Sequence, residues 1–322
     1  SDTEVILASI EKWGLPQALK KFNGMFAFAL WDREMQTLTL ARDRIGIKPL
    51  YYGWMGATFL FGSELKALKA HPEFEGRVDR ESLSLLMRFN YIPAPRSIYQ
   101  NVFKLQPGMF LTVKAGEMDS SPTTYWSFEE TARQGVQDGF DGTREEAVDQ
   151  LDSLLGSAVK LQMASDVPLG AFLSGGIDSS TIAALMQKQS PQAIKTFSIG
   201  FEEKGFDEAP YARRVAKHLG TDHTEHYVSS QDAMSIIPRL PNLYDEPFAD
   251  SSQIPTYLLS HLTRQNVTVS LSGDGGDELF CGYDRYSSWK KWWNKFHWIP
   301  EPCRKLLTGL IKAMPADVLD AG

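Results

Sequence analysis

Residues 167–181 read VPLGAFLSGGIDSST, and this stretch decides how the rest of the chain is arranged. Residues 169–173 are a short apolar run, which is typical of a strand buried on both faces of a parallel sheet. The run stops at Ser-Gly-Gly (174–176), where two residues without a Cβ atom let the backbone turn sharply and approach a ligand closely. Asp-Ser-Ser (178–180) then suits the first turn of a helix. The stretch therefore predicts a strand, a tight turn and a helix N-terminus.

This arrangement suits an anion, because a helix N-terminus presents unpaired N–H groups and the positive end of the helix dipole. A strand-to-helix turn with two glycines is also common as a purely structural feature. The order Ser-Gly-Gly, hydrophobic, Asp-Ser-Ser is much more specific, and the Gly-Lys-Ser/Thr of a Walker A loop is absent. The predicted phosphate-binding residues are Ser174, Gly175, Gly176, Asp178, Ser179 and Ser180.

These residues resemble the PP-loop of the ATP pyrophosphatases, which cleave ATP between the α and β phosphates and adenylate a substrate. The resemblance implies ATP as the nucleotide and pyrophosphate as the leaving group. The spacing of the residues alone does not specify which phosphate bond is broken.

Composition narrows the class of protein. With 322 residues and 43% hydrophobic content the chain is long enough for two domains. Its net charge of −7 argues against nucleic-acid partners, and no apolar run is long enough to cross a membrane. Only two cysteines occur, Cys281 and Cys303, which fits a reducing cytoplasmic setting. We interpret His218, His223 and His226 as surface or packing residues rather than metal ligands.

From Thr143 onward strand and helix patterns alternate. Three further strands are predicted, at 195–201, 223–228 and 267–272, with a helix at 206–220 that has Asp207 as its N-cap and is terminated by Gly220. Alternation at this spacing implies parallel β-α-β units, so we predict an α/β domain with a parallel sheet and flanking helices. Ligands of such sheets lie beyond the carboxyl ends of the strands.

The last predicted strand runs into a second glycine-rich motif, LSGDGGDELFCGYDRY at 271–286. Capping of the following helix by Asp277 is the simple structural interpretation. However, carboxylates beside a triphosphate would repel it by several kcal/mol in a partly dry site unless a cation intervened. Mg²⁺ bridging Asp178 and Asp277 to the phosphates removes this conflict, because magnesium typically binds through one or two carboxylates plus phosphate oxygens.

Residues 1–65 read differently, as the second part of a β-rich domain. A helix at the start is followed by the strand patterns MFAFALWD, TLTLARD, PLYYGW and ATFLFGS. In this region the chain closely resembles the glutamine-dependent asparagine synthetases. Over the whole chain the resemblance is strongest at residues 22–66 and 165–286. In that family this region belongs to an α+β glutaminase domain whose catalytic cysteine stands at the mature N-terminus. We therefore expect an internal fragment that lacks glutaminase activity by itself.

The resemblance implies further site residues. Asp2 matches the carboxylate that pairs with the α-amino group of glutamine, although a helix N-terminal carboxylate is an equally good interpretation. The family usually carries Glu where this chain has Asp274, which we predict as the base that accepts a proton during ammonia attack. This departure weakens the inference that aspartate is the acceptor. The residues that would surround the nucleotide are Phe172, Leu173, Ile199, Ser272 and Gly273.

The expected organisation is the C-terminal part of a glutaminase domain (1–65), a connector (66–142) and a truncated ATP-dependent synthetase domain of the PP-loop, HUP-like type (143–322). Within the connector, residues 132–142 read as a polar linker with three glycines. The acidic loop YDEPFADSS (244–252) is either a wall of the acceptor site or a solvated loop.

The expected activity is ATP-dependent adenylation of a carboxylate followed by transfer of glutamine-derived ammonia. Aspartate is the favoured acceptor; amidation of a sugar acid or polysaccharide precursor, and a nucleotide-binding relative without catalysis, stay open as alternatives. The expected partners are glutamine, ATP with Mg²⁺ and an acidic acceptor, without nucleic acid or membrane, and a homodimer is compatible with the resemblance.

Overall fold

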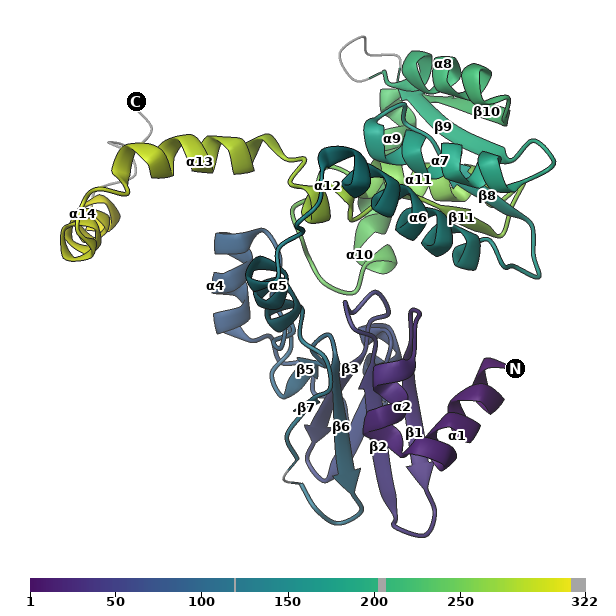
Figure 1. Cartoon of the computed structure of the whole chain (residues 1–322). Helices are drawn as coiled ribbons and strands as arrows, with labels where there is room; N and C mark the ends of the chain where they lie inside the picture. Colours follow the sequence, from purple (N-terminus) through teal and green to yellow (C-terminus); the bar gives the residue numbers. More distant parts are fainter. Residues whose placement is uncertain (119, 202–206, 314–322) are drawn as a thin grey trace. The chain divides into compact units, whose positions relative to one another are not determined.

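The structure is a computed structural model that describes residues 1–118, 120–201 and 207–313 (Figure 1). The chain forms two compact units. The first unit comprises Ser1–Asp149 and Gln231–Tyr257, and the second comprises Gln150–Ser230 and Leu258–Gly322. The predicted connector thus falls inside the first unit, and the predicted synthetase region contributes residues to both.

The first unit contains two antiparallel sheets. Their strands coincide with the four strand patterns of residues 25–62 and add three strands from the predicted connector. The first sheet has the order β1-β2-β6-β7 and consists of β1 (Ala27–Asp32), β2 (Thr37–Arg42), β6 (Met109–Lys114) and β7 (Thr123–Thr124). The second has the order β4-β3-β5 and consists of β4 (Thr58–Gly62), β3 (Tyr51–Met55) and β5 (Val102–Lys104).

Burial alternates along β3 and along the second half of β6, as strand geometry predicts. Along β3, Tyr51, Gly53 and Met55 are buried while Tyr52 and Trp54 are half-buried. The helices and short helical turns of this unit are α1 (Asp2–Trp13), α2 (Leu15–Lys21), α3 (Leu65–Lys69), α4 (Arg80–Phe89), α5 (Phe128–Gln137), η1 (Ile237–Arg239), α10 (Leu240–Leu243) and all but the first residue of α9 (Ser230–Ile236).

The prediction of a linker at residues 132–142 is wrong for the first half of this segment, because α5 continues through Gln137. The helix begins after Ser127, whose Oγ accepts a hydrogen bond from the N–H of Glu130 at 3.2 Å. Arg133 also pairs with Glu129 one turn earlier at 2.7 Å. A cap and an i,i+4 pair outweigh the propensity cost of the single Gly135.

The second unit contains a four-stranded sheet of order β10-β9-β8-β11, in which all three strand pairings are parallel, as predicted (Figure 1). The strands are β8 (Leu169–Phe172), β9 (Lys195–Phe201), β10 (Asp222–Val228) and β11 (Val269–Leu271). The helices are α7 (Ile177–Gln189), α8 (Ala209–Leu219), α12 (Gly276–Phe280), α13 (Asp284–Phe296) and α14 (Glu301–Ala313), with α6 (Arg144–Gln162) and α11 (Gln253–Thr263) crossing the unit boundaries.

The core of the second unit lies along β8. Side chains from α6, α7 and α8 pack against Ala171 and Leu173 in one hydrophobic cluster. Helix α8 starts two residues later than Asp207, whose Oδ1 accepts a hydrogen bond from the N–H of Ala209 at 3.2 Å. It ends at Gly220 in the left-handed conformation with φ 73°, as predicted. Packing of these helices fixes the carboxyl end of β8.

A polar network lies between β9 and β10. Oγ1 of Thr196 contacts Nδ1 of His223 at 2.9 Å, and Oγ of Ser198 contacts Nε2 of the same ring at 3.2 Å. Thr196 and Ser198 are buried. Burial lowers the pKa of His223, and the nearby carboxylate of Glu225 opposes this only in part. This histidine is therefore a packing residue, in line with the sequence interpretation.

We expect acid to destabilise the second unit through His223. In the unfolded chain a histidine takes up a proton near pH 6.5, whereas the folded state binds that proton only at lower pH. The free energy of unfolding should therefore fall as the pH drops from about 7.5 to about 5.5, and His223→Gln should reduce this slope. Chemical unfolding at the two pH values measures the effect. Exposed His218→Gln is the control, and equal slopes in His223→Gln and wild type would count against the assignment.

Candidate nucleotide-binding site

The first part of the site is the turn between β8 and α7. The N–H of Leu173 donates to the carbonyl of Phe197 at 2.8 Å, which ties the end of β8 to β9. Oγ of Ser174 lies 2.9 Å from Oγ of Ser179 and accepts a hydrogen bond from the N–H of Gly176 at 3.2 Å. The turn is thus closed by hydroxyl groups instead of bulky side chains.

Gly175 is required by this turn for two reasons. Its φ is 83°, in the left-handed region, and a Cβ atom there would lie 2.7 Å from the main chain of Tyr211 and Ala212. Helix α8 therefore packs directly on the loop. The N–H groups of the first turn of α7, a helix of 13 residues that follows this turn, have no partners within their own helix and are therefore available to an anionic ligand.

The second part of the site follows β11, which pairs in parallel with β8. Oγ of Ser272 donates to Oδ2 of Asp274 at 2.9 Å. Gly275 has φ 92°, and Asp277 lies in the first turn of α12. A Cβ atom on Gly282 would lie only 1.9 Å from Oδ1 of Asp277, so the carboxylate rests against the backbone at the end of α12.

The two parts are in direct contact. A Cβ atom at Gly273 would lie 2.7 Å from the N atom of Ser179, and one at Gly276 would lie 2.3 Å from Oδ2 of Asp178. Glycine at both positions lets the acidic loop pack against the first turn of α7. The structure therefore packs the loop that carries Asp274 and Asp277 against the first turn of α7, which carries Asp178 and Ser179.

The other predicted residues are placed as follows. Phe172 and Ile199, at the ends of neighbouring strands, are half-buried. Leu173 is 1% exposed and belongs to the hydrophobic core, so it can contribute only main-chain groups to a ligand. Asp2 is exposed in the first turn of α1 in the first unit, where Ser1 and Glu4 form a capping box.

The donors fit a magnesium ion only in combination with a ligand. Among the described residues no group of three His, Cys, Asp or Glu side chains could hold a metal by itself. Asp178 and Asp277 supply carboxylates from two adjoining loops, and magnesium commonly combines one or two carboxylates with phosphate oxygens. A site of this type would therefore form together with a nucleotide.

The first two acidic residues of the loop at 244–252, Asp245 and Glu246, are not solvated. The side chains of Asp245 and Glu246 are 12% and 10% exposed and bind donors of the first unit. Oδ2 of Asp245 accepts from the N–H of Leu65, and Oε1 of Glu246 accepts from the N–H of Ile98. These partners lie 180 and 148 residues away, and no local pattern could have revealed them.

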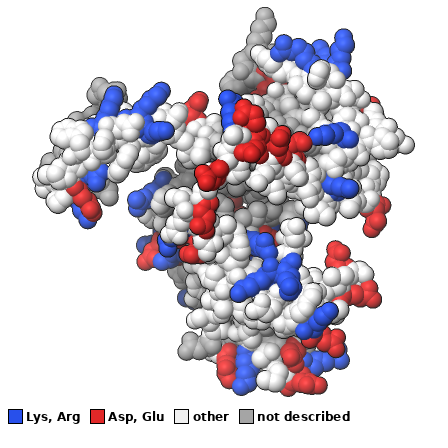
Figure 2. All heavy atoms as spheres, in the orientation of Figure 1, with Lys and Arg blue, Asp and Glu red and all other residues white. Residues whose placement is uncertain are grey.

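Charge is mixed on the surface. On the face drawn in Figure 2, Lys and Arg side chains occur in small groups among Asp and Glu. Among the described residues, no helix combines the length and apolarity needed to cross a bilayer.

Comparison with known families matches both halves of the chain. Residues 150–321 match the family described as asparagine synthase, and residues 1–126 match the glutamine amidotransferase domain. The first match includes both glycine-rich loops.

Individual relatives agree with these matches. A putative asparagine synthetase [glutamine-hydrolyzing] 2 of Methanocaldococcus jannaschii is 40% identical over 88% of this chain and 54% of its own length. Asparagine synthetase [glutamine-hydrolyzing] 1 of Bacillus subtilis is 36% identical over 98% of this chain and 48% of its own length. A putative asparagine synthetase of Mycobacterium bovis is 35% identical over the same shares, 98% and 48%. The chain thus spans about half the length of these curated relatives.

Proposed function

The chain belongs to the asparagine synthase family, and on this premise we propose that it carries the ATP site of a glutamine-dependent, amide-forming carbon–nitrogen ligase. In the proposed reaction a carboxylate attacks the α phosphate of ATP, pyrophosphate leaves, and ammonia derived from glutamine displaces AMP. The contact between the loop at 272–277 and the first turn of α7, at Asp178 and Ser179, is the observation that supports this proposal most strongly. If these two loops served only to pack the fold, they would not both need to be polar and glycine-rich at the point where they meet.

Within this proposal the loop after β8 holds the departing pyrophosphate. The hydroxyl groups of Ser174 and Ser179 and the N–H groups at the start of α7 donate hydrogen bonds to phosphate oxygens. Phe172 and Ile199 flank the adenine ring, while Leu173, Ser272 and Gly273 contribute main-chain contacts. Asp178 and Asp277 would hold Mg²⁺, which neutralises phosphate charge when bound.

Asp274 is proposed as the base that takes the proton from the attacking ammonia. Its carboxylate is exposed and is oriented by the hydroxyl of Ser272. Aspartate is shorter than glutamate by one methylene, so the proton acceptor lies nearer the main chain than it would with Glu at this position. Small displacements of a reacting group can strongly affect rate.

We expect Asp274→Asn to lose amide formation by about 10²–10⁴-fold, the usual contribution of a positioned base. Adenylation should survive, because the nucleotide contacts are made by other residues. Acceptor-dependent exchange of labelled pyrophosphate into ATP, measured beside amide product in the complete gene product, separates the two steps. If both steps fell together, Asp274 would belong to nucleotide binding instead.

Aspartate is the proposed acceptor, and the presence of Asp274 keeps a sugar acid or polysaccharide precursor as a second candidate. A panel of carboxylic acids, scored by pyrophosphate release with glutamine as donor, distinguishes the two. ATP binding without release on any acceptor would instead favour a nucleotide-binding relative that has lost catalysis.

Asp2 is proposed to pair with the α-amino group of glutamine, in the region that matches the amidotransferase domain. The three-part organisation into glutaminase region, connector and synthetase region likewise stays a proposal. The two compact units divide the chain at different positions.

A further inference from the structure

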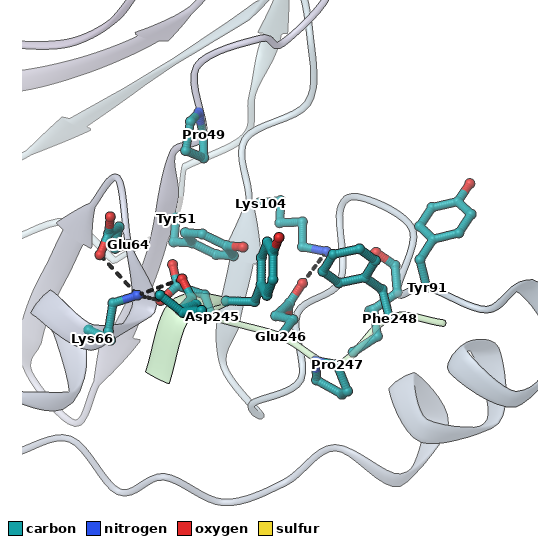
Figure 3. Close-up of a pocket in the computed structure, with 13 residues that line it drawn as sticks. Pro49, Tyr51, Glu64, Lys66, Tyr91, Lys104, Asp245, Glu246, Pro247 and Phe248 are labelled. Carbon is teal, nitrogen blue, oxygen red and sulfur yellow. Dashed lines mark hydrogen bonds and ion pairs between the residues drawn. The ribbon is translucent and has the colours of Figure 1, made fainter. Parts of the chain in front are cut away.

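Residues 243–249, called the strap below, are held on the first unit by charge and main-chain hydrogen bonds. Nζ of Lys66 lies 3.2 Å from both Glu64 and Asp245, and Lys104 pairs with Glu246 (Figure 3). Further along the strap, the N–H of Ala249 donates to the carbonyl of Asn90 at 2.7 Å. The anchors thus lie at Asp245, at Glu246 in the middle of the strap and at Ala249 at its end.

The central anchor is a buried ion pair. The side chains of Lys104 and Glu246 are 17% and 10% exposed. Nζ of Lys104 also donates to the carbonyl of Ile92 at 2.6 Å, and Oε1 of Glu246 accepts from the N–H of Ile98 at 2.7 Å. Burial raises the pKa of Glu246, and the Lys104 ammonium counteracts that rise. Removing one partner would leave the other as an uncompensated buried charge.

Apolar packing contributes little to holding the strap. The strap belongs to the segment Gln231–Tyr257 of the first unit, and the structure describes every residue of this segment. Within it, Ile236 is the only buried hydrophobic side chain. A cavity of about 360 Å³, walled by Tyr51, Tyr91 and Phe248 among others, remains beside the strap (Figure 3). Segments held mainly by polar contacts separate more readily than segments held by an apolar interface.

The strap is an excursion from the second unit along the sequence. The chain leaves the parallel sheet at Val228, the end of β10, and returns to it through α11 and β11. Helix α11 begins at Gln253, and the loop after β11 carries Ser272, Asp274 and Asp277. One helix and one strand therefore lie between the strap and the acidic loop of the proposed ATP site.

We propose that Asp245 and Glu246 form a carboxylate latch, which fixes the strap to the first unit and keeps amide formation in step with glutamine hydrolysis. This inference rests on the function proposed above. Asp245 and Glu246 are positioning residues, since they contact the chain's own donors and not a substrate. When the latch is broken, each half-reaction persists but ammonia is released without being used.

The test compares glutamate formed with pyrophosphate formed by the complete gene product supplied with glutamine, ATP, Mg²⁺ and the acceptor. The ratio should be near one in wild type, as the proposed reaction requires. In Glu246→Gln and in Lys104→Met it should rise by about two- to thirtyfold, the range found for residues that carry coupling between sites. With ammonium chloride in place of glutamine, pyrophosphate release by Glu246→Gln should stay within about twofold of wild type.

Two controls separate coupling from loss of fold. Arg96→Met removes two ion pairs of the same unit, those of Arg96 with Asp79 and with Glu81, neither of which involves the strap, and it should leave the ratio unchanged. The double variant Lys104→Met/Glu246→Gln leaves no unpaired buried charge, and its ratio should lie closer to wild type than that of Lys104→Met. Thermal unfolding confirms that each variant is folded.

An unchanged ratio in folded Glu246→Gln would overturn the latch. This variant decides the question even if Lys104→Met does not fold, because glutamine keeps the size of the side chain and its acceptor oxygen. Absence of acceptor-dependent pyrophosphate release in wild type would instead overturn the proposed function.

Discussion

Asp178→Ala is expected to abolish acceptor-dependent pyrophosphate release, lowering its rate by at least about 10²–10³-fold. Removal of one preorganised electrostatic contact to a transition state typically has an effect of this size. Asp178 lies in the first turn of α7, and its Oδ2 sits against the backbone of Gly276 in the neighbouring loop. It is thus the side chain that joins the two strand ends. In the proposed reaction it would also carry half of the magnesium site.

The measurement is pyrophosphate release by the complete gene product across a range of Mg²⁺ concentrations. Asp166→Ala, at an exposed aspartate just before β8, is the matched control and should behave as wild type. Asp178→Asn should also be inactive, since it keeps the shape but loses the charge. Activity of Asp178→Asn near the wild-type level would show that the carboxylate does not hold the metal.

The second large effect is expected from Phe197→Ala, which should destabilise the second unit by about 3–5 kcal/mol. Phe197 is 1% exposed in the middle of β9, and its ring fills the space left by Gly170, where a Cβ atom would lie 2.7 Å from it. Its carbonyl accepts the hydrogen bond from Leu173 that ends β8. The cavity left by truncation would therefore loosen the strand end that positions Ser174.

Chemical unfolding of the complete protein measures this loss. Phe140→Ala removes the same number of atoms from a side chain that is 54% exposed, and should change stability by no more than about 0.5 kcal/mol. A loss of under about 1 kcal/mol for Phe197→Ala would indicate that the Phe197 ring is not tightly packed against β8. Nucleotide affinity should fall in parallel, because the loop at 174–176 depends on the same strand.

Local sequence patterns were sufficient for the parallel sheet and for the two loops at its edge. The apolar run before Ser174 and the glycines after Leu271 each specify a backbone conformation within a few residues, so neither required knowledge of distant contacts. The rule that parallel strands end at the same edge of a sheet indicated that the two loops would be neighbours, and in the structure Asp178 lies against Gly276.

Long-range contacts explain what the sequence did not reveal. Asp245 and Glu246 read as an acidic loop because their partners, Leu65, Ile98 and Lys104, are far away in the chain. Nothing near residues 231–257 indicates that they belong to the first unit. The burial of Leu173 agrees with the buried strand predicted at 169–173, but its position at the strand end also suited a ligand pocket, and the sequence pattern could not separate a side-chain contact with a ligand from packing in the core.

The most direct test of the central claim, that the two neighbouring strand ends bind ATP for adenylation, is to identify the products of ATP. The complete gene product should be incubated with ATP, Mg²⁺, glutamine and aspartate, and the nucleotides and phosphates quantified. We expect AMP and pyrophosphate in equal amounts, formed only when the acceptor is present. Formation of ADP and inorganic phosphate would contradict the account.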